Sequence, residues 1–307
     1  MAMGVDLKSK FLGSMVGSGL GDAIGEVAFY YPEKRRLYER VDRLEKLIYT
    51  DDTAMAMGLA ESIIKNKGID SQHLGDTFSQ NFFREPWRGY ASGPPALFSL
   101  VRHEGISYVE AAKSLFGGVG SMGNGAAMRI APVGLFFHHS EHLYEEACAS
   151  AEVTHAHPVG KDGAAVQAWA IALAVKLDPE KEFPLEIFLQ NLIGFARTPE
   201  MQEKMKLLQR LISEDISAER ASDQLGRSVA VDESMPFAIY SFLRYPQSFE
   251  ECLLCAILNG GDRDTLGAMA CAISGAYLGI EAIPPSWRQK LENQTQIENL
   301  ASSLAEI

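Results

Sequence analysis

Apolar residues recur along most of this chain at the three- and four-residue spacing of an amphipathic helix. No comparable series of alternating apolar and polar positions, bounded by hairpin turns, indicates strands. The pattern therefore predicts an all-α fold. The segments with the clearest helical spacing are residues 8–24, 53–65, 125–137, 163–176, 249–259 and 265–278.

Glycine and proline interrupt these segments without forming a linker. The breaks fall at residues 93–95, at Pro158, at Pro184 and at Pro284. No repeat or low-complexity stretch divides the chain, and 307 residues can bury a large core. We therefore expect a single compact helical domain that spans residues 1–307.

Small residues are concentrated in segments 163–176 and 265–278, which predicts that these helices lie centrally, because small side chains let helix axes approach closely. Between Gly13 and Glu26, glycine recurs at every fourth position and predicts close packing of one helix face. Asp22 and Glu26 lie among these glycines, and an acid there could reach a pocket. The segments 33–46 and 200–219, rich in Lys and Glu, are expected at the periphery.

The composition, with 47% hydrophobic and 22% charged residues, is typical of a soluble globular protein. A net charge of −12 argues against non-specific binding to nucleic acid or to anionic membranes. The most apolar run, residues 266–280, is too short to span a bilayer, and residues 1–6 lack the features of a secretory signal. Four cysteines fit a reducing compartment. We therefore expect a cytoplasmic protein.

Two acidic motifs, far apart in the sequence, each precede a helical segment: Thr50-Asp51-Asp52-Thr53 and Asp262-Arg263-Asp264-Thr265. One such motif alone is typical of a helix N-cap. Together they hold more carboxylates than two caps require, and helix N-termini favour the ionised form. Their donors are hard oxygen atoms, which suit Mg²⁺ or Mn²⁺. We therefore predict that the two motifs meet at a site for two Mg²⁺ ions, with Mn²⁺ as an alternative.

Residues 117–125 include five glycines and favour a loop whose backbone N–H groups bind an anion. The loop contains a G-x-G-x-x-G string. The preceding residues 108–116 have a helical pattern, however, and a dinucleotide-binding fold needs a strand there. A flexible connection is the alternative interpretation.

The histidines and cysteines give weaker signals. The two histidines of residues 154–158 favour local hydrogen bonding over metal ligation, and the hard oxygen donors elsewhere argue against a zinc site. We expect His138, His139 and His142 on a solvated helix start. Cys252 and Cys255 fall in an apolar helical run and are expected in the core rather than as a redox pair.

Taken together, these motifs resemble the ADP-ribosylhydrolase family, helical hydrolases related to the dinitrogenase-reductase-activating glycohydrolase. The resemblance extends from Gly13 to about Trp287 and rests on residues 49–55, 123–129, 154–155 and 260–265. Residues 88–90 and 236–244 are most similar to the branch that removes serine-linked ADP-ribose and degrades poly(ADP-ribose).

The resemblance implies two Mg²⁺ ions at the bottom of a cleft for ADP-ribose. The implied metal ligands are Thr50, Asp51, Asp52, Asp262, Asp264 and Thr265. The implied ADP-ribose contacts are Phe116, Gly120, Ser121, Met122, Gly123, Asn124 and His155, with the loop 120–124 around the diphosphate. The catalytic residues are expected to be Glu26, Asp52 and Asp264, with Glu26 as a mobile acid or base.

Three residues depart from the family pattern. Phe29 stands where the serine-directed branch carries its catalytic glutamate, so we expect Glu26, one helical turn away, to substitute. Met122 replaces a tyrosine in the diphosphate loop, which predicts different contacts on the adenosine side. Arg263 replaces a threonine between the two aspartates. A cation there is expected either to alter metal affinity or to bind a phosphate.

The expected function is Mg²⁺-dependent hydrolysis of the glycosidic bond at the anomeric carbon of ADP-ribose. The substrates and partners would be ADP-ribosylated proteins, with serine linkages favoured, or conjugates such as poly(ADP-ribose) and O-acetyl-ADP-ribose. The alternatives are an arginine-directed hydrolase, a non-catalytic ADP-ribose-binding protein, a structural protein on the same scaffold, and a helical phosphatase. The sequence does not distinguish a monomer from an oligomer.

Overall fold

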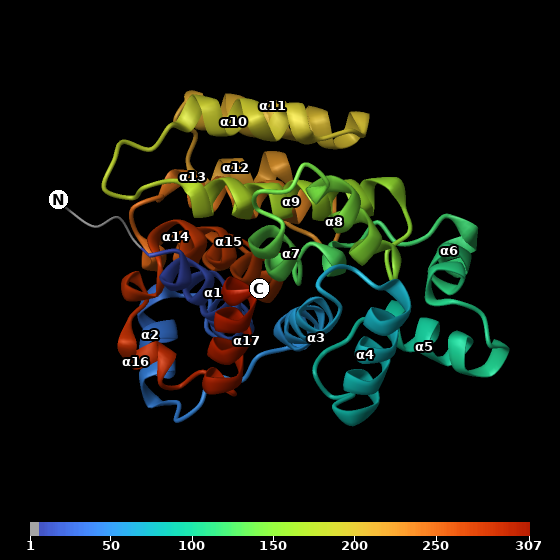
Figure 1. The fold of residues 1–307 in the computed structure, drawn as a ribbon. Coiled ribbons are helices and arrows are strands. Elements are labelled where there is room, and N and C mark those ends of the chain that lie inside the picture. The colour runs from blue at the N-terminus through green and yellow to red at the C-terminus, as the bar shows by residue number, and fades with distance from the viewer. Residues whose placement is uncertain (1–5) are drawn as a thin grey trace.

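The two central helices pack backbone against backbone. In the computed structural model, which describes residues 6–307, α1 (Leu7–Tyr30) and α15 (Arg263–Leu278) lie side by side through the middle of the molecule (Figure 1). A Cβ atom on Gly21 would lie 2.1 Å from the carbonyl oxygen of Gly267, and one on Gly267 would lie 2.2 Å from that of Gly21. Since no side chain fits between these helices, the predicted close packing of the glycine-rich face is confirmed.

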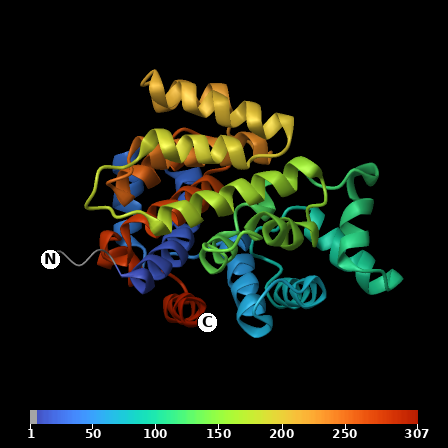
Figure 2. The same ribbon diagram turned by 45° about the horizontal axis from the view of Figure 1, so that its top comes forward.

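The remaining helices surround this pair in layers. The helices that contact α1 or α15 most extensively are α9 (Pro158–Lys176), α13 (Val231–Arg244), α14 (Phe249–Leu258) and α17 (Gln294–Glu306). Figures 1 and 2 show an outer layer on one side, formed by α10 (Leu185–Phe195) and α11 (Pro199–Ser213). Helix α12 (Ala218–Leu225) lies in the next layer, beside α13. The opposite side carries α2 (Lys34–Arg43) and α16 (Pro285–Arg288).

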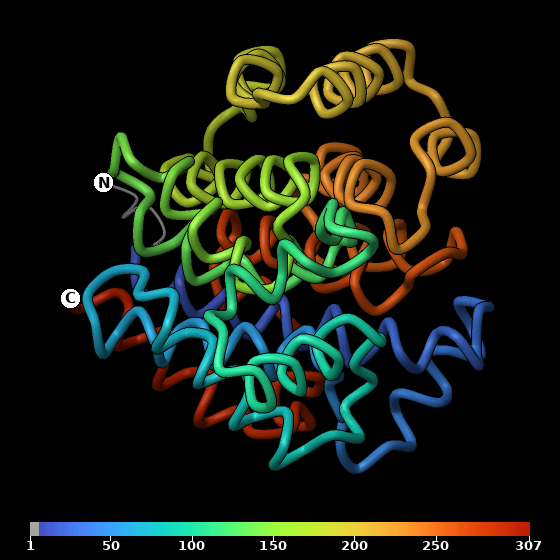
Figure 3. Tube along the Cα trace, turned by 90° about the vertical axis from the view of Figure 1, so that its right-hand side faces the viewer, coloured from blue at the N-terminus to red at the C-terminus, as the bar shows by residue number. Residues whose placement is uncertain are grey.

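A third group of helices extends from the central pair and carries part of the site. It comprises α3 (Asp51–Asn66), α4 (Ser71–Arg84), α5 (Gly93–Glu104), α6 (Tyr108–Gly118), α7 (Ala131–Phe136) and α8 (Leu143–Glu152). Figure 3 faces this side of the molecule, with α5 and α6 toward the viewer. Two 3₁₀ turns, Asn124–Ala126 and Ile280–Ala282, complete the helical elements of residues 6–307.

One continuous hydrophobic core joins these layers and confirms the predicted all-α domain. The described residues contain two isolated β-bridges and no strand. As predicted, α9 and α15 lie almost entirely in the core, whereas α2 and α11 lie at the periphery. No helix among residues 6–307 is both long and apolar enough to cross a membrane. Met1 to Val5, most of the segment expected not to form a signal peptide, lie outside the described residues.

Three local predictions need correction. First, α1 continues six residues past the predicted end at Ile24, so that it includes Glu26. Second, the predicted helix 125–137 is broken into a 3₁₀ turn and α7. Pro132 sits in the first turn of α7 and has no N–H for the bond that would continue a helix from upstream. Third, His138 is buried rather than solvated, because its Nδ1 pairs with the carbonyl oxygen of Leu135 at 2.6 Å.

The other residues of those segments agree with the predictions. His139 and His142 are exposed. Cys252 and Cys255 are buried within α14, and neither forms a disulfide.

Candidate functional site

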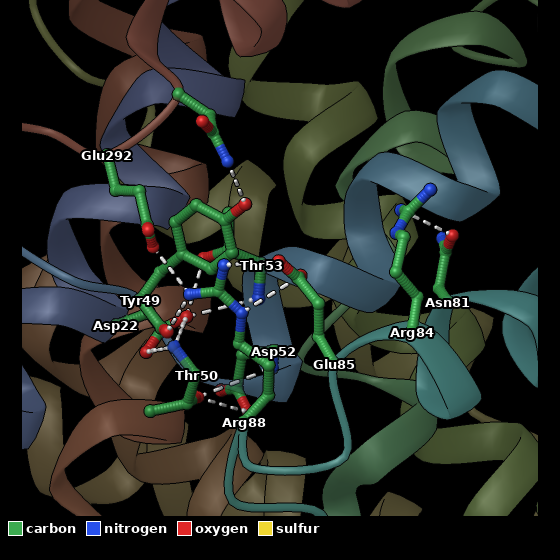
Figure 4. Close-up of polar contacts among 11 residues, drawn as sticks. Asp22, Tyr49, Thr50, Asp52, Thr53, Asn81, Arg84, Glu85, Arg88 and Glu292 are labelled. Carbon is green, nitrogen blue, oxygen red and sulfur yellow. Dashed lines mark hydrogen bonds and ion pairs between the residues drawn. The ribbon is translucent and has the colours of Figure 1, made fainter.

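The first acidic motif opens α3 and is held in place by a carboxylate from α1. The hydroxyl of Thr50 accepts a hydrogen bond from the backbone N–H of Asp52 (3.3 Å). Asp22 accepts bonds from the backbone N–H of Thr50 (3.0 Å) and from the N–H and hydroxyl of Thr53 (3.1 and 2.5 Å), as Figure 4 shows. Because Thr50 and Asp22 satisfy the helix start, the side chains of Asp51 and Asp52 are not needed as caps.

The second acidic motif opens α15. Two consecutive glycines with φ of 86° and 77° turn the chain into this helix. The backbone N–H of Asp262 donates to the carbonyl oxygen of Arg227 (2.9 Å), and its carboxylate accepts from the amide of Asn124 (2.7 Å). The carboxylate of Asp264 accepts the N–H of Thr265 at 2.9 Å. The motif is therefore tied both to the glycine-rich loop and to the segment before α13.

A cavity of about 610 Å³ lies between the two motifs, a size typical of small-ligand sites, roughly 300–1,000 Å³. Of the residues predicted for the site, these line it: Asp51, Asp52, Phe116, Gly120, Ser121, Met122, Gly123, Asn124, His155, Asp262, Asp264 and Thr265. Thr50 and Glu26 do not line it. Thr50 acts as the cap described above, and Glu26 is half-buried on α1, close enough to Asp264 to raise the pKa of that carboxyl group.

The carboxylates of the site raise one another's pKa values. Burial and the neighbouring Asp22 raise the pKa of Asp51 to about 7, and burial and Asp262 raise that of Asp264 to about 8. The pKa of Asp52 is raised well above its usual range by burial and by the charges of Asp22 and Asp264. Burial also raises the pKa of Asp22 to about 6, although its hydrogen bonds oppose that shift. Without a cation, these crowded carboxyl groups therefore retain protons at a higher pH than ordinary aspartates do.

A buried arginine lies beneath this cluster. Arg129 donates to the hydroxyl of Thr154 (2.8 Å), and its guanidinium lies 4.6 Å from the ring centre of Phe78. Burial lowers the pKa of Arg129 to about 9, against the opposing effect of Asp51. Burial and this arginine lower the pKa of His155 to about 3, so that its imidazole is neutral at physiological pH. His155 is thus a neutral hydrogen-bonding group in the wall of the cavity.

The glycine-rich loop forms another wall of the cavity. Phe116 has a φ of 52° and a side chain that is 58% exposed at the cavity edge. Gly120 has a φ of 75°, and a Cβ there would lie 2.7 Å from the backbone nitrogen of His157. The carbonyl oxygen of Met122 accepts the N–H of Val231 at 3.1 Å, which fixes the loop against α13. Main-chain contacts therefore hold this loop against the start of α9 and against the start of α13.

Arg88 supports the first acidic motif through its backbone and its side chain. The carbonyl oxygen of Arg88 accepts the N–H of Asp51 at 2.8 Å. The guanidinium of Arg88 is buried 4.2 Å from the ring centre of Tyr49 and forms ion pairs with Glu85 and Glu292 (Figure 4). Residue 88 thus anchors the loop before α5, part of which lines the cavity.

Three features of the site were not assigned from the sequence. Asp22 was noted only as an acid among glycines, and a charged residue within a small-residue helix face is the signal that would have identified it. Arg129 was noted only as part of a family motif. Val229 and Ala230 line the cavity from the segment before α13. No periodicity or motif distinguishes these two residues, because they reach the site only through backbone contacts with the glycine-rich loop.

The donor atoms fit a divalent cation in chemistry. Within residues 6–307, no three His, Cys, Asp or Glu side chains already converge as a metal-binding group. The carboxylates nevertheless come from two helix starts that face one cavity, and the Oδ2 atom of Asp52 is buried without a hydrogen-bond partner. A buried oxygen of this kind is unfavourable unless a cation or a donor satisfies it. An all-oxygen donor set suits Mg²⁺.

Comparison with known proteins identifies relatives over the whole length. A family model described as ADP-ribosylglycohydrolase matches residues 3–307. Human ADP-ribosylhydrolase ARH3 is 32% identical, with 96% of this chain and 93% of that protein covered. The Xenopus tropicalis protein of the same name is 32% identical and covers 100% of this chain, with 97% of its own length matched. An uncharacterized protein of Archaeoglobus fulgidus is 33% identical, with 98% and 97% covered.

A solved structure also shares the fold. A chain of an ADP-ribosylglycohydrolase-related protein complex superposes with a TM-score of 0.74 and covers 98% of both chains. At 23% sequence identity, this likeness concerns the arrangement of the helices alone.

Proposed function

Since the chain belongs to the ADP-ribosylglycohydrolase family, we propose that it hydrolyses the glycosidic bond at the anomeric carbon of ADP-ribose in a Mg²⁺-dependent reaction. The favoured substrates are proteins with serine-linked ADP-ribose. Poly(ADP-ribose) and O-acetyl-ADP-ribose are further substrates of the same chemistry, and an arginine-linked conjugate is the alternative.

The observation that carries this proposal is the convergence of both acidic motifs and the glycine-rich loop on one cavity. The loop offers backbone groups to a diphosphate, and the acidic motifs offer oxygen ligands to Mg²⁺. A phosphatase would also use acidic ligands, but it gives no reason for an exposed aromatic residue, Phe116, at the cavity edge. A nucleotide that spans both ends of the cavity accounts for both features.

Each group of cavity residues would have its own role. Asp51, Asp52, Asp262 and Asp264, with Thr265, would hold the metal ions, and Thr50 keeps the first motif in position. What bound Mg²⁺ would supply is orientation of the ribose hydroxyls and polarisation of a water. The transition state of glycosidic hydrolysis resembles an oxocarbenium ion, and carboxylates beside the anomeric carbon stabilise its positive charge.

The remaining contacts bind the rest of the nucleotide. Residues 120–124 would enclose the diphosphate, because all five line the cavity. The neutral imidazole of His155 would hydrogen-bond a ribose or phosphate oxygen without adding charge. Phe116 and Met122 would contact the adenosine end, where both side chains are partly exposed.

Glu26 is proposed as the acid or base, and it would have to turn toward the cavity from α1. Phe29, at the position of the family glutamate, is 43% exposed and cannot transfer a proton. The position of Glu26 outside the cavity lining also favours a second candidate function, a non-catalytic ADP-ribose-binding protein.

A panel of defined conjugates tests both candidates. The purified protein is incubated with serine-, arginine- and O-acetyl-linked ADP-ribose and with poly(ADP-ribose), with Mg²⁺ or with a chelator. Release of ADP-ribose only with Mg²⁺ supports the hydrolase. Calorimetric binding of ADP-ribose with no release from any conjugate supports the binding protein, and neither binding nor release would overturn both.

A further inference from the structure

Two arginines converge beside Gly260, the first of the two glycines that precede α15. If a Cβ atom were placed on Gly260, it would lie 3.4 Å from Nε of Arg227 and 4.0 Å from Nη2 of Arg263. Both guanidinium groups therefore approach the same point above a glycine. Like charges in such proximity repel each other, so their arrangement needs a reason.

Internal contacts do not neutralise this pair. Arg227 donates to a carboxylate oxygen of Asp223 at 2.7 Å. Arg263 donates through Nη1 to the carbonyl oxygen of Ile257, and it forms no ion pair with any carboxylate of residues 6–307. One carboxylate thus faces two guanidinium groups, in a protein whose net charge is −12.

The pair lies beside the acidic end of the cavity but outside it. Arg263 stands between Asp262 and Asp264, which both line the cavity, whereas its own side chain does not. The carbonyl oxygen of Arg227 accepts the backbone N–H of Asp262. Arg227 also lies two positions before Val229, which lines the cavity. A group bound by the two arginines would therefore lie next to the second acidic motif, just outside the cavity.

We propose that Arg227 and Arg263 form a second anion subsite, which binds a phosphate group on the leaving-group side of the substrate. The inference rests on the proposed function. The ligand chemistry is that of the diphosphate of an adjoining ADP-ribose unit in a chain. Guanidinium groups bind phosphate through paired N–H donors, and two of them match its several acceptor oxygens and its double charge. A single carboxylate side chain of a peptide offers fewer acceptors and less charge.

The test compares two substrates that differ on the leaving-group side. One is a dimer of ADP-ribose units, and the other is a peptide with a single serine-linked ADP-ribose. We expect Arg263→Gln and Arg227→Gln each to raise KM for the dimer about tenfold, the contribution of one charge-assisted hydrogen bond at a partly exposed site. The KM for the peptide should not change. The KM for the dimer should also rise with salt concentration in the wild type and less so in the variants.

Arg220→Gln is the matched control, because Arg220 is an exposed arginine of α12 and its loss changes the net charge equally. Arg263→Lys keeps the charge and should retain part of the affinity for the dimer. Thermal unfolding of each variant shows whether the bond to Ile257 matters for folding. If Arg263→Gln does not fold, Arg227→Gln alone decides the result.

Three outcomes would overturn the inference. The first is an unchanged KM for the dimer in both glutamine variants, with the wild type active on both substrates. The second is an equal loss on both substrates. The third is a loss confined to peptides with acidic residues beside the modified serine, which would assign the pair to the peptide.

A wild type that cleaves neither substrate would instead contradict the proposed function. The subsite is then tested alone by calorimetry with inorganic diphosphate in the metal-free protein. Weaker binding to the Arg227→Gln, Arg263→Gln double variant than to Arg220→Gln supports the subsite, and equal binding overturns it.

Discussion

At the scale of single residues, the site depends on a division between carboxylates that hold the backbone and carboxylates that remain available. Asp22 uses its oxygens on the N–H groups and hydroxyl at the start of α3. Asp51 and Asp52 keep theirs for the cavity. Sequence alone revealed the acidic motif but not this division, because the partner of the motif lies on another helix.

Substitution of two acids should separate metal binding from proton transfer. Asp264→Ala removes a cavity carboxylate and is expected to abolish both Mg²⁺ binding and release of ADP-ribose. Glu26→Gln keeps the shape of a side chain outside the cavity lining, so Mg²⁺ binding should be intact while turnover falls about 10²- to 10⁴-fold. Calorimetry with Mg²⁺ and a release assay measure the two effects. Full activity of Glu26→Gln would show that another residue transfers the proton.

Asp22→Asn should weaken both the fold and the proposed Mg²⁺ binding. An amide in place of the carboxylate turns a donor toward the N–H groups of Thr50 and Thr53, at an expected cost of about 1–3 kcal/mol in the free energy of unfolding. Mg²⁺ affinity should fall as well, since Asp22 positions the first acidic motif. Urea unfolding and Mg²⁺ calorimetry provide the two measurements.

Asp162→Asn is a chemically matched control. Asp162 is also fully buried, and it accepts the backbone N–H groups of Arg197 and Thr198 and the hydroxyl of Thr198. It does so at the start of α11, outside the cavity. The Asp162→Asn variant should lose about as much stability as Asp22→Asn and should retain the Mg²⁺ affinity of the wild type. Equal Mg²⁺ affinity in Asp22→Asn and Asp162→Asn would show that Asp22 has only a structural role.

At the scale of elements, sequence periodicity predicted which segments are helical better than where they end. The small residues of α9 and α15 correctly placed these two helices at the centre, and the glycine-rich face of α1 correctly predicted close packing. The break between residues 126 and 131 was missed, because apolar spacing continues through it. Val229 and Ala230 could not be predicted as cavity residues. Backbone hydrogen bonds bring them to the cavity, and the sequence does not indicate which backbone groups pair.

Gly21→Ala should destabilise the protein strongly. The added methyl group would lie 2.1 Å from the carbonyl oxygen of Gly267, which belongs to the main chain and cannot rotate away. We expect a loss of about 1–3 kcal/mol or more in the free energy of unfolding, measured with urea. Separation of α1 from α15 should also lower Mg²⁺ affinity, because each helix carries acids of the site.

Gly194→Ala provides the comparison, because it makes the same substitution in helix α10, where no other atom lies within 4 Å of the new methyl group. Alanine is the better helix former, so this variant should gain about 0.5–1 kcal/mol. A loss of stability in Gly194→Ala equal to that in Gly21→Ala would contradict the importance of the close contact.

At the scale of the whole molecule, the acidic site makes the stability of the metal-free protein depend on pH. The pKa values of Asp22, Asp51 and Asp264 are raised to about 6, 7 and 8, and that of Asp52 is raised well above its usual range. In the unfolded chain these groups ionise near pH 4. Between these values the folded protein binds more protons than the unfolded chain. Stability from this cluster is therefore present at low pH and is lost as the pH rises from about 4 to about 8.

Thermal unfolding across this pH range, with and without Mg²⁺, measures the effect. The metal-free wild type should lose stability relative to Asp264→Asn as the pH rises, by on the order of a few kcal/mol. Mg²⁺ should restore the stability of the wild type, because a ligand that binds only the folded state stabilises that state. The gain should be largest at pH 8, where the carboxylates have lost their protons. Parallel pH profiles for the two proteins, unaffected by Mg²⁺, would contradict the electrostatic description of the site.

The contact between α1 and α15 also limits how parts of this protein could be exchanged with those of its relatives. Gly13 meets Gly275 and Gly21 meets Gly267 through main-chain atoms, so the register of the two helices is fixed at both ends. A slip of one residue would drive a side chain into a carbonyl group. A chimaeric protein of this family would therefore have to inherit both helices from one parent, whereas the outer helices α10 and α11 could come from another.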